Sequence, residues 1–291
     1  MSTSVSLQTT VVGSFPKPKY IKIPDFFSDN AKGEKPAGLL GIGTDAYSQF
    51  MASKSKEDLE NLEKDILQAT EEIIQEQREC GVDVVTDGEV RRENYIYYFC
   101  RFVDGISFEE MTEVGVRNNA FKANVPTIVG DVKWRGPINL AEEWKKSQEK
   151  STVPVKYTLP GPMTIMGSTV DVHYKDEKRL AADLAAVVNR HVLELAAAGC
   201  KHIQVDEPVF ARNPDKALDY GVECLEKCFE GCPPDVEKAM HMCCGYPGHI
   251  DHKDYPKADQ GSYVRLAPAL DASIIDAVSI EDAWCSNDLS L

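Results

Sequence analysis

A histidine and a cysteine stand two positions apart in the segment His241-Met242-Cys243. Because side chains two positions apart in a β-strand point to the same side, this imidazole and this sulfur can converge on one ion. Nitrogen and sulfur ligands together suit zinc, and the carboxylate of Glu281, at the end of the next predicted strand, can add a third ligand. Three protein ligands leave one position open, as in catalytic zinc sites. The same spacing also fits a buried thiol beside an ordinary histidine, so the surrounding chain must decide between the two interpretations.

The elements that must position these residues alternate along the chain, with short β-rich segments between longer helical patterns, as in βα units around a parallel sheet. Long helices are predicted over 57–80 and 177–198, where apolar residues recur at helical spacing and a glycine follows the last turn. Loops are predicted over 28–56 and 109–125. Seven strands are predicted, over 9–12, 82–86, 127–129, 155–159, 202–205, 238–242 and 277–280.

Polar, metal-capable, glycine or proline residues follow nearly every predicted strand, and (β/α)8 barrels build their active sites at that rim. The sequence therefore predicts an α/β fold, a TIM (β/α)8-type barrel formed by residues 1–291 as one domain. An open doubly wound sheet fits less well, because neither glycine-rich phosphate-binding motif occurs. Only seven strands can be predicted, so we expect a barrel that is incomplete at its C-terminal end. Its open edges then need the tail or a second copy to cover them.

Composition excludes several classes of partner. The 291 residues include 32 Lys and Arg against 47 Asp and Glu, a net charge of −15, which disfavours nucleic acid and anionic membranes. No apolar stretch approaches the roughly 18 residues of a membrane-spanning helix, and no leader pattern opens the chain. Nine cysteines, an odd number spread over a long chain, indicate a reducing compartment, so a cytoplasmic location is expected.

Six motifs occur in order over about residues 8–283. They are Thr9–Pro16, Asp87–Glu89 with Arg91–Asn94, Leu159–Thr164, Gln204–Pro208, His241–Cys243 and Ser279–Glu281. Together they are far more specific than any one of them, and in this arrangement the chain resembles the catalytic domain of cobalamin-independent methionine synthases. The resemblance implies a TIM barrel whose zinc ion binds the thiol of homocysteine, which then accepts a methyl group from a reduced folate.

The resemblance also implies roles for individual residues. Backbone groups of Val12, Gly13 and Ser14 would meet the carboxylate of the amino acid, and Glu89 and Asp206 would hold its ammonium group. Each has a plainer alternative, because a carboxylate can instead pair with a neighbouring arginine or a helix N-terminus, and a Gly-Ser pair can form a simple turn.

The zinc ligands implied by the resemblance are His241, Cys243 and Glu281. The family's fourth ligand, a cysteine well downstream, has no counterpart before the chain ends, and Cys285 stands only four positions after Glu281. The chain therefore appears as a C-terminally truncated form without the duplicated N-terminal domain. No catalytic residue is assigned beyond these ligands.

The side of the site that would receive the methyl donor departs from the family. Ser168 stands where a folate-stacking tryptophan is usual, and Phe121-Lys122 replaces an arginine-cysteine pair. Three alternatives follow: a thiol alkyltransferase with a non-folate donor, a non-catalytic relative that binds a thiol or amino acid, and a truncated gene product. Two other groups of residues are not assigned to the candidate site. Cys224, Cys228 and Cys232 are interpreted as packing residues on one helical face, and His249 and His252 as solvated histidines.

Overall fold

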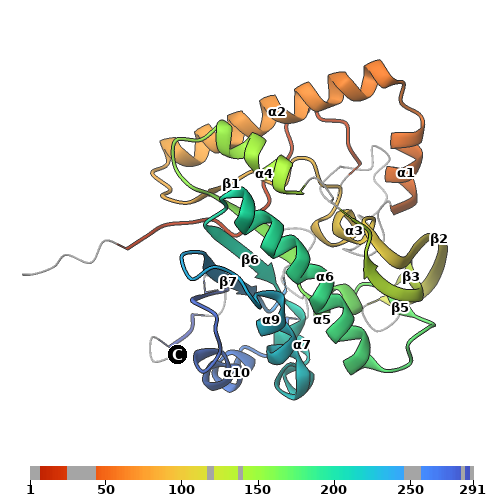
Figure 1. Ribbon diagram of the computed structural model, residues 1–291, viewed down its shortest axis with the longest axis vertical. Helices are drawn as coiled ribbons and strands as arrows, with labels where there is room; N and C mark the ends of the chain where they lie inside the picture. Colours follow the sequence, from red (N-terminus) through yellow and green to blue (C-terminus); the bar gives the residue numbers. More distant parts are fainter. Residues whose placement is uncertain are drawn as a thin grey trace, which may run out of the picture.

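The computed structural model describes residues 7–24, 44–116, 121–136, 140–245, 257–282 and 286–288. Helices and strands alternate through most of this length, and the longest helices lie on the outside (Figure 1). The helices are α1 (Thr44–Ala52), α2 (Lys56–Glu79), α3 (Tyr95–Cys100), α4 (Leu140–Glu149), α5 (Pro162–Met166), α6 (Glu177–Ala198), α7 (Val209–Arg212), α8 (Pro214–Lys216), the π-helix η1 (Ala217–Gly221), α9 (Val222–Cys228) and α10 (Gly261–Asp271). The strands are β1 (Val85–Thr86), β2 (Val103–Val116), β3 (Phe121–Trp134), β4 (Val155–Pro160), β5 (Val170–Asp171), β6 (His202–Asp206), β7 (Glu237–Met242) and β8 (Ala277–Ile280).

Local sequence signals determine where the two long helices begin and end. A capping box of Ser55 and Asp58 opens α2, satisfying backbone N–H groups that no earlier turn can reach. Asp176 caps the N-terminus of α6, and Gly199, with a φ of 108°, ends it in the left-handed conformation. Both helices predicted from the sequence are confirmed, and α6 has the predicted bounds.

A five-stranded parallel sheet with the order β1-β4-β6-β7-β8 forms the centre of the molecule. Thr10 extends it by one parallel bridge to Val84, so the N-terminal segment lies beside β1. The strands after β1 match the predicted ones within one residue at each end. Helices α4, α6 and α9 cover the outer face of this sheet (Figure 1). A parallel sheet of this kind with helices on its outer face, but with fewer than eight strands, is an incomplete (β/α)8 barrel. Within the described ranges, no further strand pairs with β8.

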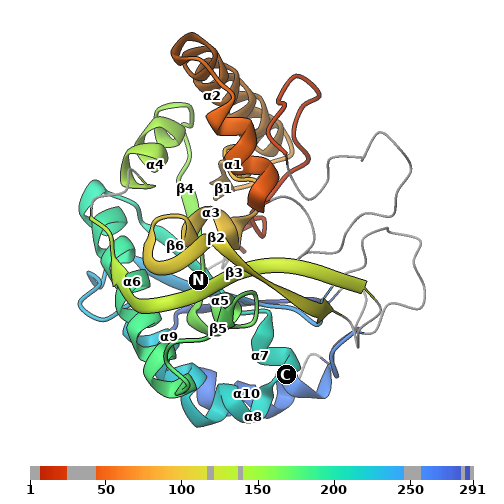
Figure 2. The same ribbon diagram turned by 90° about the vertical axis from the view of Figure 1, so that its right-hand side faces the viewer.

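Three predictions about local structure are wrong. The strand predicted at 9–12 is reduced to the single bridge at Thr10. The segment 127–129, predicted as the third barrel strand, belongs to β3, which pairs antiparallel with β2 and parallel with β5 in a separate three-stranded sheet. The predicted loops also contain regular structure, because α1 lies within 28–56 and the β2–β3 hairpin covers most of 109–125. This hairpin extends outside the barrel sheet (Figure 2).

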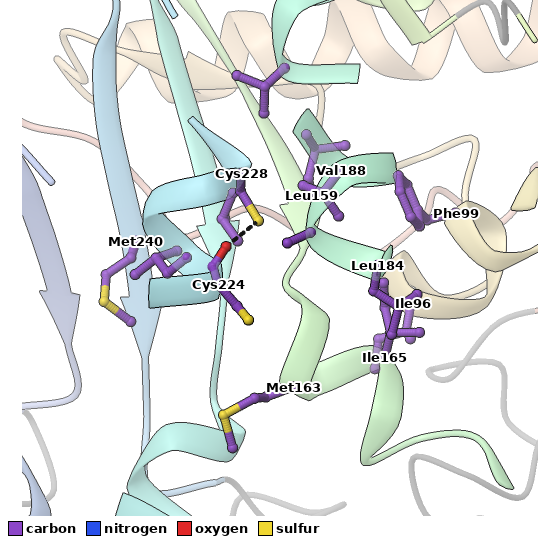
Figure 3. Close-up of a cluster of buried hydrophobic side chains, with 14 of the residues drawn as sticks. Ile96, Phe99, Leu159, Met163, Ile165, Leu184, Val188, Cys224, Cys228 and Met240 are labelled. Carbon is purple, nitrogen blue, oxygen red and sulfur yellow. Dashed lines mark hydrogen bonds between the residues drawn. The ribbon is translucent and has the colours of Figure 1, made fainter. Parts of the chain in front are cut away.

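The core fills the space between the sheet and its helices. Apolar side chains of β4, β7, α3, α5, α6 and α9 meet there (Figure 3). Cys224 and Cys228 are among them and Cys232 packs against this core, which confirms all three thiols as packing residues, although Cys232 follows the end of α9 and does not lie on its face. Strand β4 is buried on both faces: Tyr157 and Leu159 join this core, whereas Lys156 and Thr158 alternate with them on the barrel interior. No helix among the described residues has the length and apolar character that crossing a membrane requires.

Candidate functional site

Glu89 lies in the tight turn that follows β1, where Asp87 accepts a hydrogen bond from the Glu89 backbone N–H at 2.9 Å. Its φ is +55°, a strained value for a residue with a side chain, and such strain concentrates at functional sites. The turn directs the carboxylate into the barrel, where Thr158 Oγ1 on β4 donates to Glu89 Oε1 at 2.7 Å. Only 7% of Glu89 is exposed. The chain therefore holds a buried carboxylate at the carboxyl end of β1.

Gly13 lies directly against this carboxylate. Thr86 Oγ1 donates to the Gly13 carbonyl at 2.6 Å and holds the N-terminal segment against the end of β1. A Cβ atom at Gly13 would come within 2.7 Å of Glu89 Oε1. The close approach explains why a residue without a side chain stands at this position.

Asp206 closes β6 and is the second buried carboxylate of the site, with 6% of its surface exposed. Gln204 Nε2 donates to Asp206 Oδ1 at 2.7 Å and also to the Val12 carbonyl at 2.9 Å. Burial raises the pKa of Asp206 to about 8, and the nearby negative charge of Glu89 adds to this shift. A buried acidic group whose ionisation is disfavoured by a neighbouring carboxylate forms a site that a cation would stabilise.

Arg92 is the positive group nearest to Glu89. Its Nη1 donates to the carbonyl and the hydroxyl of Thr158 and lies 3.7 Å from Glu89 Oε1, while its guanidinium stacks on the ring of Tyr157. Arg91 instead pairs with Glu63 on α2. The arginine that lies beside Glu89, as the plainer interpretation of this carboxylate requires, is therefore Arg92 and not Arg91. Two hydrogen bonds of Arg92 nevertheless go to Thr158.

The two remaining substrate residues predicted from the sequence differ in their contacts. Val12 contributes its carbonyl to the contact with Gln204, while its side chain is half exposed. Ser14 is exposed beside Gly13. The structure therefore brings Val12, Gly13, Glu89 and Asp206 together and leaves Ser14 at the surface next to them.

His241 faces the barrel interior at the end of β7. Its Nδ1 lies 3.0 Å from Ser279 Oγ on β8, which leaves Nε2 as the nitrogen that can face a ligand. Burial lowers the pKa of His241 to about 4, with a further contribution from the charge of Lys156. Burial likewise raises the pKa of the Cys243 thiol. Both groups are therefore neutral without a metal ion, whose charge would favour the thiolate.

Glu281 follows β8 and pairs through Oε1 with Lys257. Its other oxygen, Oε2, is buried and has no hydrogen-bond partner among the described residues. An unpartnered carboxylate oxygen, a neutral imidazole and a thiol are the donor types that zinc prefers, so the residues fit such an ion chemically. In the described part of the chain, however, no three His, Cys, Asp or Glu side chains are grouped as metal ligands. Cys285, His249 and His252 lie outside the described residues.

Sequence reasoning missed two residues of this site, Lys156 and Thr158, whereas Arg92 was foreseen as a possible partner of Glu89. The signal for Lys156 was available, because a lysine within an otherwise buried strand needs a polar environment. Both are polar residues that bond to backbone or carboxylate oxygens inside the barrel. They supply the buried carboxylates and the N-terminal segment with partners.

The parallel sheet, its covering helices and the polar groups at the carboxyl ends of its strands define an incomplete (β/α)8 barrel with its candidate site at the usual rim. Residues 44–252 match the family model described as the catalytic domain of cobalamin-independent synthases, and the chain belongs to this family.

The chain is also similar to curated methionine synthases. The chain is 29% identical to the methionine synthase of Sulfolobus acidocaldarius over 257 residues, which are 87% of this chain and 66% of the relative. It is 31% identical to the methionine synthase of Saccharolobus solfataricus, over 84% of this chain and 65% of the relative. The chain thus spans just under two thirds of the length of these relatives.

Two solved structures resemble the fold. A B12-independent methionine synthase from Shewanella sp. W3-18-1, in complex with selenomethionine, superposes with a TM-score of 0.75 at 31% identity. The match covers 94% of this chain and 72% of that one. A putative B12-independent methionine synthase from Listeria monocytogenes matches at a TM-score of 0.55 and 17% identity, over 81% of this chain and 84% of that one. The second match concerns the fold alone.

Proposed function

We propose that this chain is a zinc-dependent methyltransferase that transfers a methyl group to the thiol of homocysteine and forms methionine. The observation that carries the proposal is the pair of buried carboxylates, Glu89 and Asp206, beside the Val12–Gly13 segment. Such a pair favours a cationic ligand group, and an amino acid provides an ammonium group together with a carboxylate. The family membership and the selenomethionine bound in the Shewanella relative support an amino-acid ligand of the methionine type.

The residues of this chain would orient the amino acid. Glu89 and Asp206 hold the ammonium group from two neighbouring sides of the barrel, and backbone groups of Val12, Gly13 and Ser14 meet the carboxylate. The strained turn at Glu89 and the amide of Gln204 hold the two acids in place before the ligand arrives. Preorganised positioning of this kind contributes several kcal/mol to an oriented transfer reaction.

A zinc ion would be held by His241, Cys243 and Glu281. When bound, zinc deprotonates the thiol of the substrate and keeps its sulfur nucleophilic near neutral pH. Ser279 fixes the orientation of His241 through Nδ1, as partners of metal-binding histidines commonly do. The structure has these donor types near the ends of β7 and β8, where the amino-acid thiol would have to lie.

The methyl donor remains a choice between two classes. Ser168 is a buried residue directly after α5 and offers no aromatic surface for a pterin ring. A non-folate methyl donor is therefore the second candidate. A cytoplasmic location and a second copy of the chain at the open edge of the barrel are two further predictions. Neither affects the outcome of a zinc analysis or a methyl-transfer assay.

The test is a zinc analysis combined with a methyl-transfer assay on the purified chain. We expect about one zinc per chain and formation of methionine from homocysteine with at least one of several methyl donors, folate and non-folate. A His241→Ala/Cys243→Ser double variant should lose both the zinc and the activity. A chain that contains no zinc after purification under metal-replete conditions would overturn the proposal.

A matched control variant is Cys224→Ser, which replaces a buried thiol on α9, away from the strand ends. It should keep the zinc content, whatever its effect on stability. Binding of homocysteine without turnover with any donor would instead favour a non-catalytic relative.

A further inference from the structure

Lys156 is a lysine buried in the barrel interior, with 3% of its surface exposed. Its Nζ donates to the Val11 carbonyl at 2.6 Å and to Gln204 Oε1 at 2.6 Å. The first bond joins residues 145 positions apart, on the N-terminal segment and on β4. A buried ammonium group is costly unless it is fully bonded, so this arrangement needs a function that offsets the cost.

Gln204 accepts the second hydrogen bond and connects Lys156 to Asp206. An ammonium group only donates, so the oxygen of the Gln204 amide must face Lys156. The amide nitrogen then faces the opposite way, where it donates to the Val12 carbonyl at 2.9 Å and to Asp206 Oδ1 at 2.7 Å. One lysine thus fixes which end of the amide faces Asp206.

We propose that Lys156 and Gln204 form a positioning pair that sets the distance between the Val11–Val12 segment and the Asp206 carboxylate. This pair would act on an α-amino acid ligand, because the Val11–Val12 segment leads into the backbone assigned above to the ligand carboxylate (Val12, Gly13 and Ser14), and Asp206 is assigned to its ammonium group. The inference rests on the proposed function and adds the residues that hold the two halves of the site in register.

The contacts support a positioning function over a purely structural one. A residue needed only for packing would be apolar at a buried position of β4, as Tyr157 and Leu159 are on the other face. The pair instead bonds to two successive carbonyls of the N-terminal segment, whose only ladder contact with the sheet is the bridge at Thr10 among the described residues. Without the pair, this segment loses two of its attachments to the barrel interior.

The experiment measures binding of L-methionine to the full chain by calorimetry, for the wild type and for Lys156→Met and Gln204→Leu. We expect Kd to rise at least tenfold in each variant. The desamino analogue 4-(methylsulfanyl)butanoate, which lacks the ammonium group, should bind weakly and with the same Kd in all three proteins. In the homocysteine assay, the KM for homocysteine should rise while the KM for the methyl donor stays unchanged.

The two residues should also behave as one unit. A Lys156→Met/Gln204→Leu double variant should bind L-methionine about as weakly as either single variant, because each removes the same arrangement. Lys156→Arg, which restores a buried donor, should recover part of the affinity. If Gln204→Leu does not fold, Gln204→Glu keeps the contact with Lys156 and removes both donors.

The matched control is Gln148→Leu. Gln148 on α4, like Gln204, makes three hydrogen bonds, but all of them go to the backbone, to Ser151, Val153 and Val155 at the opposite end of β4. It should lower stability without changing the Kd for L-methionine. A folded Gln204→Leu protein with wild-type affinity, or an equal loss for the desamino analogue, would overturn the positioning function. A wild-type chain that binds no amino acid would instead refute the proposed function, and the positioning pair with it.

Discussion

The carboxylate of Glu89 occupies the space that a side chain on Gly13 would need. A Cβ at Gly13 would lie 2.7 Å from Glu89 Oε1 and 3.3 Å from the methyl group of Thr158. The N-terminal segment and the turn after β1 therefore fit together only while position 13 is a glycine. The contact joins two residues to which we assign opposite ends of the same ligand.

Replacing Gly13 by alanine tests this relationship. The Gly13→Ala variant must displace the end of the Glu89 side chain, which is flexible but bonded to Thr158. We expect the free energy of unfolding to fall by less than about 2 kcal/mol, because one hydrogen bond is lost. The KM for homocysteine should rise tenfold or more in steady-state assays. Val12→Ala, which keeps the backbone and shortens a half-exposed side chain, should leave KM unchanged.

Gly161 makes a similar contact with a different consequence. A Cβ there would overlap the carboxyl group of Glu207, which is fully buried. Glu207 accepts three hydrogen bonds from Met163 and Thr164 at the start of α5. Gly161→Ala should lower the free energy of unfolding by about 2–4 kcal/mol in urea titrations, because a buried carboxylate leaves its partners. Gly130→Ala, where a Cβ meets only open space and one atom at 3.8 Å, is the control and should cost far less.

The binding of an amino acid should release a proton near pH 7. In the free protein the pKa of Asp206 is raised to about 8, so this carboxyl group is mostly protonated at neutral pH. An ammonium ligand favours the carboxylate and lowers that pKa, so affinity should increase as the pH rises toward 8. Calorimetry of L-methionine in buffers with different ionisation enthalpies would measure the released proton. Asp206→Asn should abolish the release, and a wild type that binds without releasing protons would contradict the assignment.

Acid should destabilise the chain through His191 on α6. This histidine is buried, neither ring nitrogen has a hydrogen-bond partner in the part of the chain that the structure describes, and burial lowers its pKa to about 4. Because the unfolded chain keeps a pKa near 6.5, it takes up the proton first as the pH falls. Stability is therefore fully present above about pH 6.5, and by pH 4 roughly 3 kcal/mol of it is lost.

The His191→Gln variant isolates this effect from the acid response of the carboxylates. Its loss of stability between pH 6.5 and 4.5 should be smaller than that of the wild type, measured by denaturant unfolding at each pH. Equal slopes in the two proteins would show that Glu194, whose Oε2 lies 3.4 Å from His191, compensates the protonated ring.

Ser279 should tune the proposed metal site without contacting the metal. Its hydroxyl lies 3.0 Å from His241 Nδ1 and orients the ring. Ser279→Ala should weaken zinc binding about tenfold, measured by competition with a chromogenic chelator, because partners of metal-binding histidines contribute on that order. Ser273→Ala, which removes a hydroxyl bonded to the α10 carbonyl of Leu270, is the control. Unchanged zinc affinity in Ser279→Ala would speak against His241 as a ligand.

The elements whose signals are local follow from the amino-acid sequence alone. Caps and apolar spacing define α2 and α6, because helical hydrogen bonds join residues four positions apart. Strands β4, β6, β7 and β8 could be predicted from buried runs followed by glycine, proline or polar residues. The ordered motifs also predicted Glu89 and Asp206 as site residues, and the structure buries both carboxylates at the carboxyl ends of β1 and β6.

The pairing of segments and the partners of buried polar groups emerge only in the folded chain. The segment 127–129 has the composition of a buried strand, but its register with β2 places it in another sheet, and composition does not specify a pairing partner. Lys156 reaches Val11 across 145 positions, a contact that no local pattern encodes. Strand propensity depends on local residues, whereas hydrogen bonds inside a barrel depend on which strands become neighbours.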